Sequence, residues 1–230
     1  MNISLPFTVL YEDEHYIAIN KPPKIMVHRT SITEDKQFVL QLLRNQIQTK
    51  LYPIHRLDRG TTGVLIFAKS KEAASQLGQQ FQKHIIGKQY LAIVRGFIEE
   101  QSWTVDYALA KETWLDKKVA ITHFEQLAKV EIPVAIGRYE TARYTFVKAM
   151  PETGRRHQIR RHLSHLRHPV IGDKRHGDVK HNRHWKEQFE IDRMLLHAQF
   201  LQFKHPFEQQ RISIKAVSYT HLTPPTILLV

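Results

Sequence analysis

One short stretch decides the interpretation of this chain, His55-Arg56-Leu57-Asp58-Arg59-Gly60-Thr61-Thr62-Gly63, and it runs directly into the apolar residues 64–68. An aspartate stands between two arginines in a segment with two glycines, just before residues typical of a strand. This order predicts a loop at the end of a strand, with one carboxylate and guanidinium groups beside it. From spacing alone, Asp58 is either a catalytic carboxylate or one half of a structural ion pair.

The composition narrows the class of protein. The chain has 230 residues, of which 42% are hydrophobic and 24% charged, as in an ordinary globular protein. It has no cysteine, which excludes disulfides, thiolate ligands for zinc and a thiol nucleophile. No apolar run reaches the roughly 18 residues of a membrane helix, and the first residues lack the pattern of a secretory signal. We therefore expect a cytoplasmic protein that does not contact a membrane.

The positive charge is concentrated in one part of the chain. The formal net charge is +12, and residues 154–186 hold ten Lys and Arg against two Asp. A solvated basic face would suit charge spread over the whole surface, whereas a concentrated patch favours binding to the phosphates of a polyanion. The residues predicted to contact these phosphates are Arg155, Arg156, Arg161, Arg167, Lys174 and Arg175.

Strand and helix patterns alternate without a regular βαβ repeat. Strands are predicted at 9–11, 16–19, 64–68, 89–95, 141–149, 198–204 and 211–216. Helices are predicted at 37–47, after the capping residue Ser70, and from Gly154 to His168-Pro169. The inner face of the second helix is predicted to consist of Ala74, Leu77, Phe81 and Ile85. Residues 100–138 suggest a connection with short elements. The fold class is therefore α+β, in one domain over residues 1–217.

The last thirteen residues differ from the rest. Residues 218–230 carry no Asp, Glu, Lys or Arg, and they include Pro224-Pro225. Two interpretations stay open, a native terminal strand and a non-native tail. We assign this anomalous tail no function.

Elimination leaves a single carboxylate as the reactive group. No second carboxylate lies near Asp58 in the sequence, as glycosidase chemistry would need, and no Ser-His arrangement indicates acyl transfer. An aspartate held ionised by a guanidinium remains, as nucleophile or base. His162, His165 and His168 are spaced by three, which suits two ligands on one helical face poorly, so no metal is predicted.

Four segments resemble motifs of one enzyme family, the RluA-type pseudouridine synthases. The stretch at Asp58 is similar to the family motif His-Arg-Leu-Asp-x-x-Thr-Ser-Gly. Residues 88–96 (Lys-Gln-Tyr-Leu-Ala-Ile-Val-Arg-Gly) resemble its second motif and residues 154–162 (Gly-Arg-Arg-His-Gln-Ile-Arg-Arg-His) its third. Leu195-Leu196-His197-Ala198 resembles a further element. The resemblance extends from residue 8 to about residue 216.

The resemblance implies isomerisation of a uridine in RNA to pseudouridine, without a cofactor. It implies a pseudouridine-synthase fold, with a mixed, mostly antiparallel sheet, flanking helices and a central RNA-binding cleft. Asp58 is the implied catalytic residue, acting through a covalent adduct or by deprotonating the ribose. Arg56 fills the place of the flipped-out base, Tyr90 stacks on the uracil, Arg160 pairs with Asp58, and Leu196 walls the pocket.

Other segments resemble one branch of the family, the TruC branch, which modifies uridine 65 of transfer RNA. These are residues 134–144, 161–173 and His176-Gly177-Asp178. The predicted partner is therefore tRNA; no S4 RNA-binding domain and no protein partner are predicted. Two other functions stay open, a ribosomal RNA substrate and RNA binding without catalysis.

Two positions depart from the family pattern. Thr62 stands where Ser is usual, which keeps the hydroxyl. Lys24 stands where glycine is common. If this position needs a positive φ, the loop at Lys21–His28 either differs here or carries strain.

Overall fold

The chain forms two compact units. The structure, a computed structural model, describes residues 6–29, 37–110 and 116–217. Unit 1 combines the described residues up to Lys88 with Ala198–Val217, and unit 2 comprises the described residues of Gln89–His197. Both units lie inside the predicted domain 1–217, whereas the predicted tail 218–230 lies outside the described residues.

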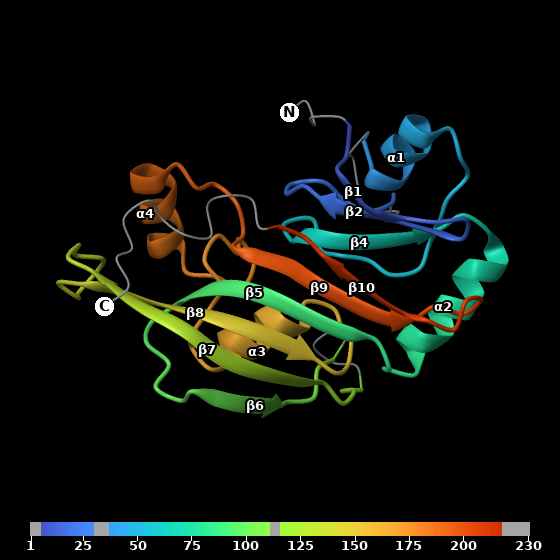
Figure 1. The fold of residues 1–230 in the computed structure, drawn as a ribbon. Coiled ribbons are helices and arrows are strands. Elements are labelled where there is room, and N and C mark those ends of the chain that lie inside the picture. Colours follow the sequence, from blue (N-terminus) through green and yellow to red (C-terminus); the bar gives the residue numbers. More distant parts are fainter. Residues whose placement is uncertain (1–5, 30–36, 111–115, 218–230) are drawn as a thin grey trace. The chain divides into compact units, whose positions relative to one another are not determined.

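Unit 1 is a sheet with two helices (Figure 1). Its strand order is β1-β2-β4-β9-β10, with β3 beside β4, and β1–β2, β2–β4, β3–β4 and β9–β10 are antiparallel. The first two residues of β9 belong to unit 2. The elements are β1 (Val9–Glu12), β2 (Tyr16–Lys21), α1 (Val39–Ile47), β3 (Tyr52–Pro53), β4 (Thr62–Ala68), α2 (Lys71–Gln82), β9 (Leu196–Lys204) and β10 (Arg211–Lys215).

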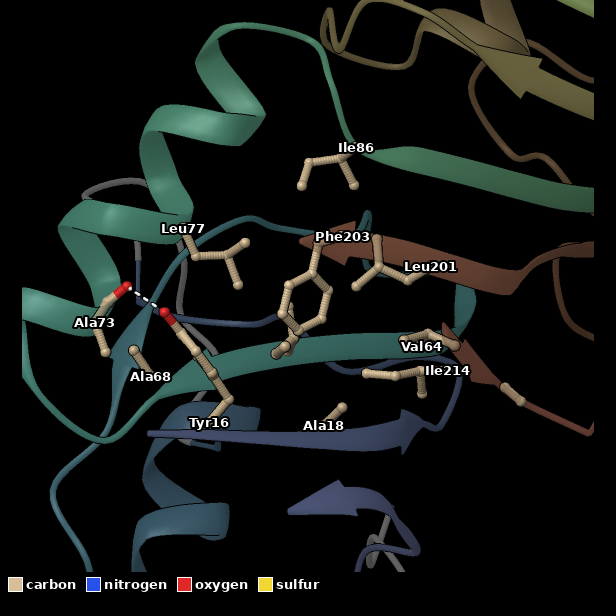
Figure 2. Packing of buried hydrophobic residues seen from close by; sticks show 12 residues of the cluster. Tyr16, Ala18, Val64, Ala68, Ala73, Leu77, Ile86, Leu201, Phe203 and Ile214 are labelled. Carbon is tan, nitrogen blue, oxygen red and sulfur yellow. Dashed lines mark hydrogen bonds between the residues drawn. The ribbon is translucent and has the colours of Figure 1, made fainter. Parts of the chain in front are cut away.

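The centre of this sheet is buried on both faces. Every residue of β2 and β4 is buried, which explains their nearly continuous apolar sequences. On one face the strands pack against Ala73 and Leu77 of α2 (Figure 2). The Tyr16 hydroxyl on this face donates to the Ala73 carbonyl at 3.1 Å. The blue helix α1, on the other side of β2 and β4 in Figure 2, buries Val39 and Leu43.

Unit 2 combines sheet strands with its own two helices (Figure 1). Its strand order is β5-β8-β7-β6, and each neighbouring pair is antiparallel. The first two residues of β5 belong to unit 1. The elements are β5 (Gly87–Arg95), β6 (Ser102–Asp106), β7 (Ile121–Ile132), β8 (Ala142–Pro151), α3 (Gln158–His165) and α4 (Val179–Phe189).

The helices of unit 2 cover opposite faces of its sheet. Ile159 and Leu163 of α3 pack in one cluster with Ala92 of β5. Trp185 of α4 packs in another cluster with Ile93, the next residue of β5. Successive residues of a strand point to opposite faces, so α3 and α4 enclose the sheet between them. No helix among the described residues has the length and apolar character to cross a membrane.

The structure confirms the α+β class and the predicted strands and helices at their approximate positions, with three exceptions. Residues 100–138 are not a connection with short elements, because they contain β6 and the twelve-residue strand β7. A bulge between Gln126 and Ala128 breaks the alternation that would reveal β7. Helix α4 was not predicted, because it buries only Trp185 and has no apolar stripe. Helix α2 ends at Gln82, which leaves Ile85 63% exposed instead of inside.

Lys24 has a strained backbone conformation, which is one of the two alternatives that its sequence left open. Its φ is 66°, in the left-handed region that disfavours a side chain with a Cβ atom. The residue lies in the turn that follows β2. The turn therefore keeps a conformation suited to glycine although the sequence has lysine.

We predict that Lys24→Gly stabilises the protein by about 0.5–1 kcal/mol, since relief of the strain outweighs the added entropy of the unfolded chain. Urea unfolding measures this change. Lys83→Gly is the matched control, because Lys83 has a φ of −78° and should gain nothing. Equal effects of the two substitutions would contradict the assignment of strain to Lys24.

Candidate active site

A tight turn presents Asp58 in unit 1. The Thr61 N–H donates to the Asp58 carbonyl at 3.1 Å, with Arg59 and Gly60 at the corner. Asp58 is half-buried, and Thr61 behind it is buried. Strand β4 begins at Thr62, and at its second residue, Gly63, φ is 105° and an added Cβ would lie 2.1 Å from the Ala198 carbonyl oxygen. The glycine of this motif is therefore required by its conformation and by lack of space.

Two cations connect this turn to the segment after β2. The ammonium group of Lys21 is fully buried and donates to the carbonyls of Pro22, Arg59 and Thr61, at 2.9, 3.2 and 2.8 Å. In return, Nε of Arg59 donates to the Lys24 carbonyl at 3.2 Å. Lys21 was not predicted as a site residue. Its only local sign is a lysine at the end of an apolar strand, before two prolines.

Burial lowers the pKa of Lys21 to about 7, although the negative charge of Asp58 acts in the opposite direction. Lys21 also donates to two carbonyls of the turn that carries Asp58. Lys21 therefore belongs to the surroundings of the predicted catalytic carboxylate.

The first residue of the motif, His55, has a structural role. The Ile66 N–H of β4 donates to its Nε2 at 3.2 Å, and its ring stacks on Phe81 with centroids 4.8 Å apart. Burial, with a smaller effect of the charge of Lys88, lowers the pKa of His55 to about 3. The ring is thus a neutral acceptor at ordinary pH. The predicted substrate contact Arg56, which follows it, is exposed.

In unit 2, Gln158 organises the third motif. Its Oε1 accepts hydrogen bonds from the Thr153 hydroxyl at 2.7 Å and from the Arg155 N–H at 2.9 Å. Its Nε2 donates to the Ile121 carbonyl at 2.9 Å, at the start of β7. Since Gln158 is the first residue of α3, these bonds fix where the helix begins, and with it the position of Arg160.

Arg160 forms a buried, two-point ion pair with Asp173. Its Nε and Nη2 donate to the two carboxylate oxygens, each at 2.7 Å, and the Asp173 side chain has no exposed surface. Asp173 Oδ1 also accepts from the N–H groups of Arg175 and His176. Asp173 was not predicted as a site residue. The predicted partner of Arg160, Asp58, belongs to the other unit, and that pair stays a prediction.

The pKa of Asp173 lies below its ordinary value. Burial alone would raise it, but the hydrogen bonds and positive charge of Arg160 and the backbone donors outweigh this effect. Asp173 is therefore a carboxylate at neutral pH, and it holds the guanidinium of Arg160 in one orientation.

The predicted residues Tyr90 and Leu196 both pack in unit 2 with residues of α3. Leu196 is buried in the cluster that contains Ile159 and Leu163, and the half-buried Tyr90 packs against the same cluster. Unit 2 thus brings together an aromatic ring, an apolar wall and the helix that carries Arg160.

The six basic residues that the sequence predicted to contact the RNA backbone divide into two groups. Nε of Arg155 donates to the Val119 carbonyl at 3.0 Å, and Nη1 of Arg161 donates to the Ala110 carbonyl at 2.8 Å. These two arginines therefore also hold loops of unit 2. The remaining four are exposed: Arg156, Arg167, Lys174 and Arg175.

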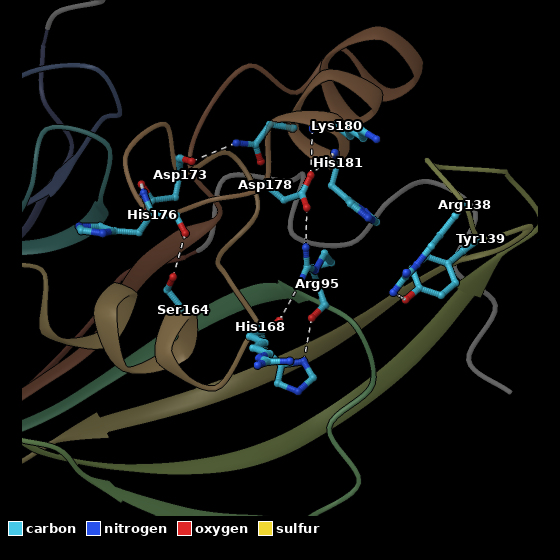
Figure 3. A network of polar contacts seen from close by, with 12 residues as sticks. Arg95, Arg138, Tyr139, Ser164, His168, Asp173, His176, Asp178, Lys180 and His181 are labelled. Atoms are coloured by element: carbon cyan, nitrogen blue, oxygen red, sulfur yellow. Dashed lines mark hydrogen bonds and ion pairs between the residues drawn. The ribbon is translucent and has the colours of Figure 1, made fainter.

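A polar network fixes the segment that follows helix α3 (Figure 3). Arg95 at the end of β5 pairs with Asp178, which caps α4. Nη2 of Arg95 also donates to the Arg167 carbonyl at 3.0 Å. Nδ1 of His168 donates to the Arg95 carbonyl at 2.8 Å. Arg167 is therefore presented from a rigid segment.

One cluster of described residues, Asp13, His205 and Glu208, has the composition of a metal site. Nε2 of His205 donates to Asp13 Oδ2 at 3.1 Å, and the Glu208 N–H donates to His205 Nδ1 at 3.0 Å. Asp13 Oδ2 also accepts from the Tyr11 hydroxyl. Both ring nitrogens of His205 are thus engaged in hydrogen bonds that connect two turns, which is a structural arrangement.

Comparisons with known proteins give a consistent result. Residues 15–165 match the family described as RNA pseudouridylate synthase. Over 221 residues the chain is 46% identical to tRNA pseudouridine synthase C of Vibrio parahaemolyticus, covering 90% of this chain and 89% of the relative. It is also 46% identical to tRNA pseudouridine synthase C of Yersinia pestis, covering 90% and 85%.

Solved structures share the fold. Human RNA pseudouridylate synthase domain containing 1 has a TM-score of 0.75 at 24% identity, covering 95% of this chain and 86% of that one. Human RNA pseudouridylate synthase domain containing 4 has a TM-score of 0.72 at 23% identity, covering 93% and 89%.

We predict that Asp173→Ala lowers the free energy of unfolding at pH 7 by about 3–5 kcal/mol, because it leaves Arg160 buried without its carboxylate. The pKa of Asp173 in the folded chain is below the ordinary 3.8. The contribution of this carboxylate to the free energy of unfolding is therefore complete above pH 3.8 and falls as the pH drops through the folded pKa. Urea unfolding at several pH values should show the gap to wild type narrowing in acid.

Glu99→Gln is the control for this experiment. Glu99 pairs with Lys129, but its side chain is 77% exposed, so we expect a loss under about 1 kcal/mol. A loss of the same size for both variants would show that Asp173 contributes no more than a surface ion pair.

Proposed function

Because this chain belongs to the RNA pseudouridylate synthase family, adopts its fold and is therefore an isomerase, we propose that it converts a uridine of tRNA to pseudouridine. The observation that carries the proposal is the 46% identity, over 90% of the chain, with an enzyme named tRNA pseudouridine synthase C. The position proposed is uridine 65, in the acceptor and T-stem region. A cytoplasmic location is part of the proposal.

Asp58 is the proposed catalytic residue. Its carboxylate either attacks C1′ of the target ribose or removes a proton from the sugar, and the C1′–N1 bond breaks. The detached uracil rotates and forms a bond from C5 to C1′, which releases the carboxylate from its adduct or, in the second route, returns the abstracted proton to the sugar. C5 then loses its proton. The turn that carries Asp58 supports this role, because its backbone is held by the buried Lys21 and by the Thr61 hydrogen bond.

The other proposed residues bind the displaced nucleotide. Taking the uridine out of its stack costs a few kcal/mol, and the exposed Arg56 is proposed to fill the vacated place. Tyr90 stacks on the uracil and Leu196 walls its pocket, a proposal supported by their packing in one cluster of unit 2. Arg160 acts on the reacting carboxylate with an orientation fixed by Asp173.

We predict that the purified protein forms pseudouridine in tRNA and that Asp58→Asn abolishes the reaction while RNA affinity stays within about threefold, because the amide is neither nucleophile nor base. Carbodiimide mapping with reverse-transcription stops, on bulk tRNA and rRNA from a pseudouridine-deficient host, measures this. Asp106→Asn, a change at an exposed aspartate of β6, is the control and should stay active.

Each other result of that mapping has a definite meaning. A stop in rRNA alone would keep the enzyme and overturn the tRNA assignment. Full activity of Asp58→Asn would remove Asp58 from catalysis. No stop in either RNA would favour RNA binding without catalysis.

We predict that RNA affinity falls steeply with salt and that neutralising three exposed arginines reduces this dependence. Replacing Arg156, Arg167 and Arg175 by Gln should lower the slope of log K against log salt by about 0.7–0.9 for each phosphate that the protein no longer neutralises. Filter binding between about 50 and 300 mM salt, a range over which the screening of exposed charges changes strongly, measures the slope.

The control removes the same charge elsewhere. Lys50, Lys71 and Lys83 are exposed in unit 1, and changing them to Gln should leave most of the slope intact. Equal slopes for the two triple variants would show that net charge, and not the basic segment, governs binding.

A further inference from the structure

We propose that the turn between β7 and β8, together with the start of α4, forms a second RNA-binding surface of this protein. This tip surface consists of four exposed residues, Arg138, Tyr139, Lys180 and Arg183. Tyr139 stacks on an unpaired base of the tRNA, and the three cations bind the phosphates beside that base. The inference rests on the proposed function for the identity of its partner. None of the six basic residues predicted from the sequence belongs to this surface.

The turn between β7 and β8 holds its exposed residues in a fixed arrangement. The Ile136 N–H donates to the Tyr139 carbonyl at 3.1 Å, which leaves Gly137 and Arg138 at the corner. Gly137 has a φ of 70°, and a two-residue hairpin turn favours glycine with a positive φ at its first corner position. A turn that is already ordered loses little conformational entropy when it binds a partner.

Arg138 orients the ring of Tyr139. The guanidinium group lies over the ring, 5.0 Å from its centroid, and Nη2 donates to the Tyr139 hydroxyl at 2.9 Å. Tyr139 is nevertheless 59% exposed, more than any other aromatic residue in the part of the chain that the structure describes. A ring that its own neighbours keep in water contributes little to the core and offers a surface on which a base can stack.

Helix α4 adds cations at the same place. Ile136 packs in one cluster with Trp185 of α4, so the turn and the helix form one body. A Cβ atom added at Gly137 would lie 3.5 Å from Nζ of Lys180, which shows that the lysine side chain lies against the turn. Arg183 follows three residues later in α4 and is therefore a neighbour of Lys180 on the helix surface.

Side chains at the start of α4 fix this helix to the turn that contains Asp173. Asn182 Oδ1 accepts from the Gly172 N–H at 2.7 Å, and Nδ2 of the same side chain donates to the Asp173 carbonyl at 3.0 Å. Asp178 caps the helix and pairs with Arg95 (Figure 3). The tip surface is therefore held within unit 2 in a fixed position relative to the buried ion pair of Asp173.

The chemistry of the tip surface fits an unpaired stretch of RNA. Arg138, Lys180 and Arg183 are exposed cations in a chain of net charge +12, which favours a polyanion. A phosphate group alone makes no use of an exposed aromatic ring, whereas an unpaired base stacks on a tyrosine ring. Bases inside a duplex are stacked on one another already, so the ring of Tyr139 selects an unpaired base.

Affinities for two RNAs test the proposal. The first RNA is the tRNA, and the second is a blunt-ended duplex with the same number of nucleotides, which has phosphates but no unpaired base. Tyr139→Ala should weaken binding of the tRNA by about 5- to 100-fold, the effect of losing one stacked base, and should leave binding of the duplex within about twofold. Tyr139→Phe keeps the ring and should bind both RNAs within about threefold of wild type.

The charge of the surface is tested separately. Lys180→Gln combined with Arg183→Gln should weaken binding of both RNAs and lower the slope of log K against log salt by about 0.7–0.9 for each lost phosphate contact. Glu140→Gln, a change at an exposed residue beside the turn, and Phe207→Ala, a change at a 37% exposed ring of unit 1, are the matched controls. Neither control should weaken binding of either RNA.

Kinetics distinguish a binding surface from an effect on the reaction. Tyr139→Ala should raise KM for the tRNA and leave kcat at saturating tRNA unchanged, because the contact is the same in the ground state and the transition state. A fall in kcat with an unchanged KM would overturn the proposal.

The other contrary outcomes are distinct. Equal losses of affinity for the tRNA and the duplex in Tyr139→Ala would show that the ring does not stack on an unpaired base, and would overturn the proposal. Wild-type tRNA affinity in both Tyr139→Ala and the double variant would overturn it as well, and would leave the surface to a partner other than RNA. If wild type binds tRNA but forms no pseudouridine, the proposed function fails, whereas a selective loss of tRNA affinity in Tyr139→Ala would still support this surface.

Discussion

The candidate site depends on two buried cations that donate hydrogen bonds to oxygen atoms of nearby turns. In unit 1 the acceptors of Lys21 are three backbone carbonyls, and in unit 2 the acceptor of Arg160 is the carboxylate of Asp173. A buried cation tolerates little movement of its acceptors, because each broken hydrogen bond exposes the full penalty of desolvation. The turns that carry the predicted reactive groups are rigid for this reason.

The sequence allowed much of the fold to be predicted where burial follows a simple pattern. Strands β2 and β4 are buried on both faces and have continuous apolar sequences, and Ser70 caps α2 as expected, accepting the Ala73 N–H. Strand β7 and helix α4 lack such patterns. The bulge after Gln126 shifts the alternation of β7, and Asp178 determines the start of α4 without an apolar stripe behind it.

The site was predictable only where its residues form local motifs. The turn after Asp58 and the αL residue His157 before α3 lie within contiguous motif sequences. Lys21 and Asp173 act across 40 and 13 residues of sequence respectively. Lys21 contacts a backbone carbonyl, and Asp173 contacts a guanidinium on another element. Neither contact produces a periodic or compositional pattern in the sequence.

The two buried charges also make the stability of the protein depend on pH. Asp173 keeps its pair with Arg160 until the pH falls through its lowered pKa, so acid weakens unit 2. Burial lowers the pKa of Lys21 to about 7, so above that pH the folded chain releases a proton that the unfolded chain still keeps. Both groups bind a proton more weakly in the folded chain than in the unfolded chain, and both therefore make the folded state more favourable as the pH rises.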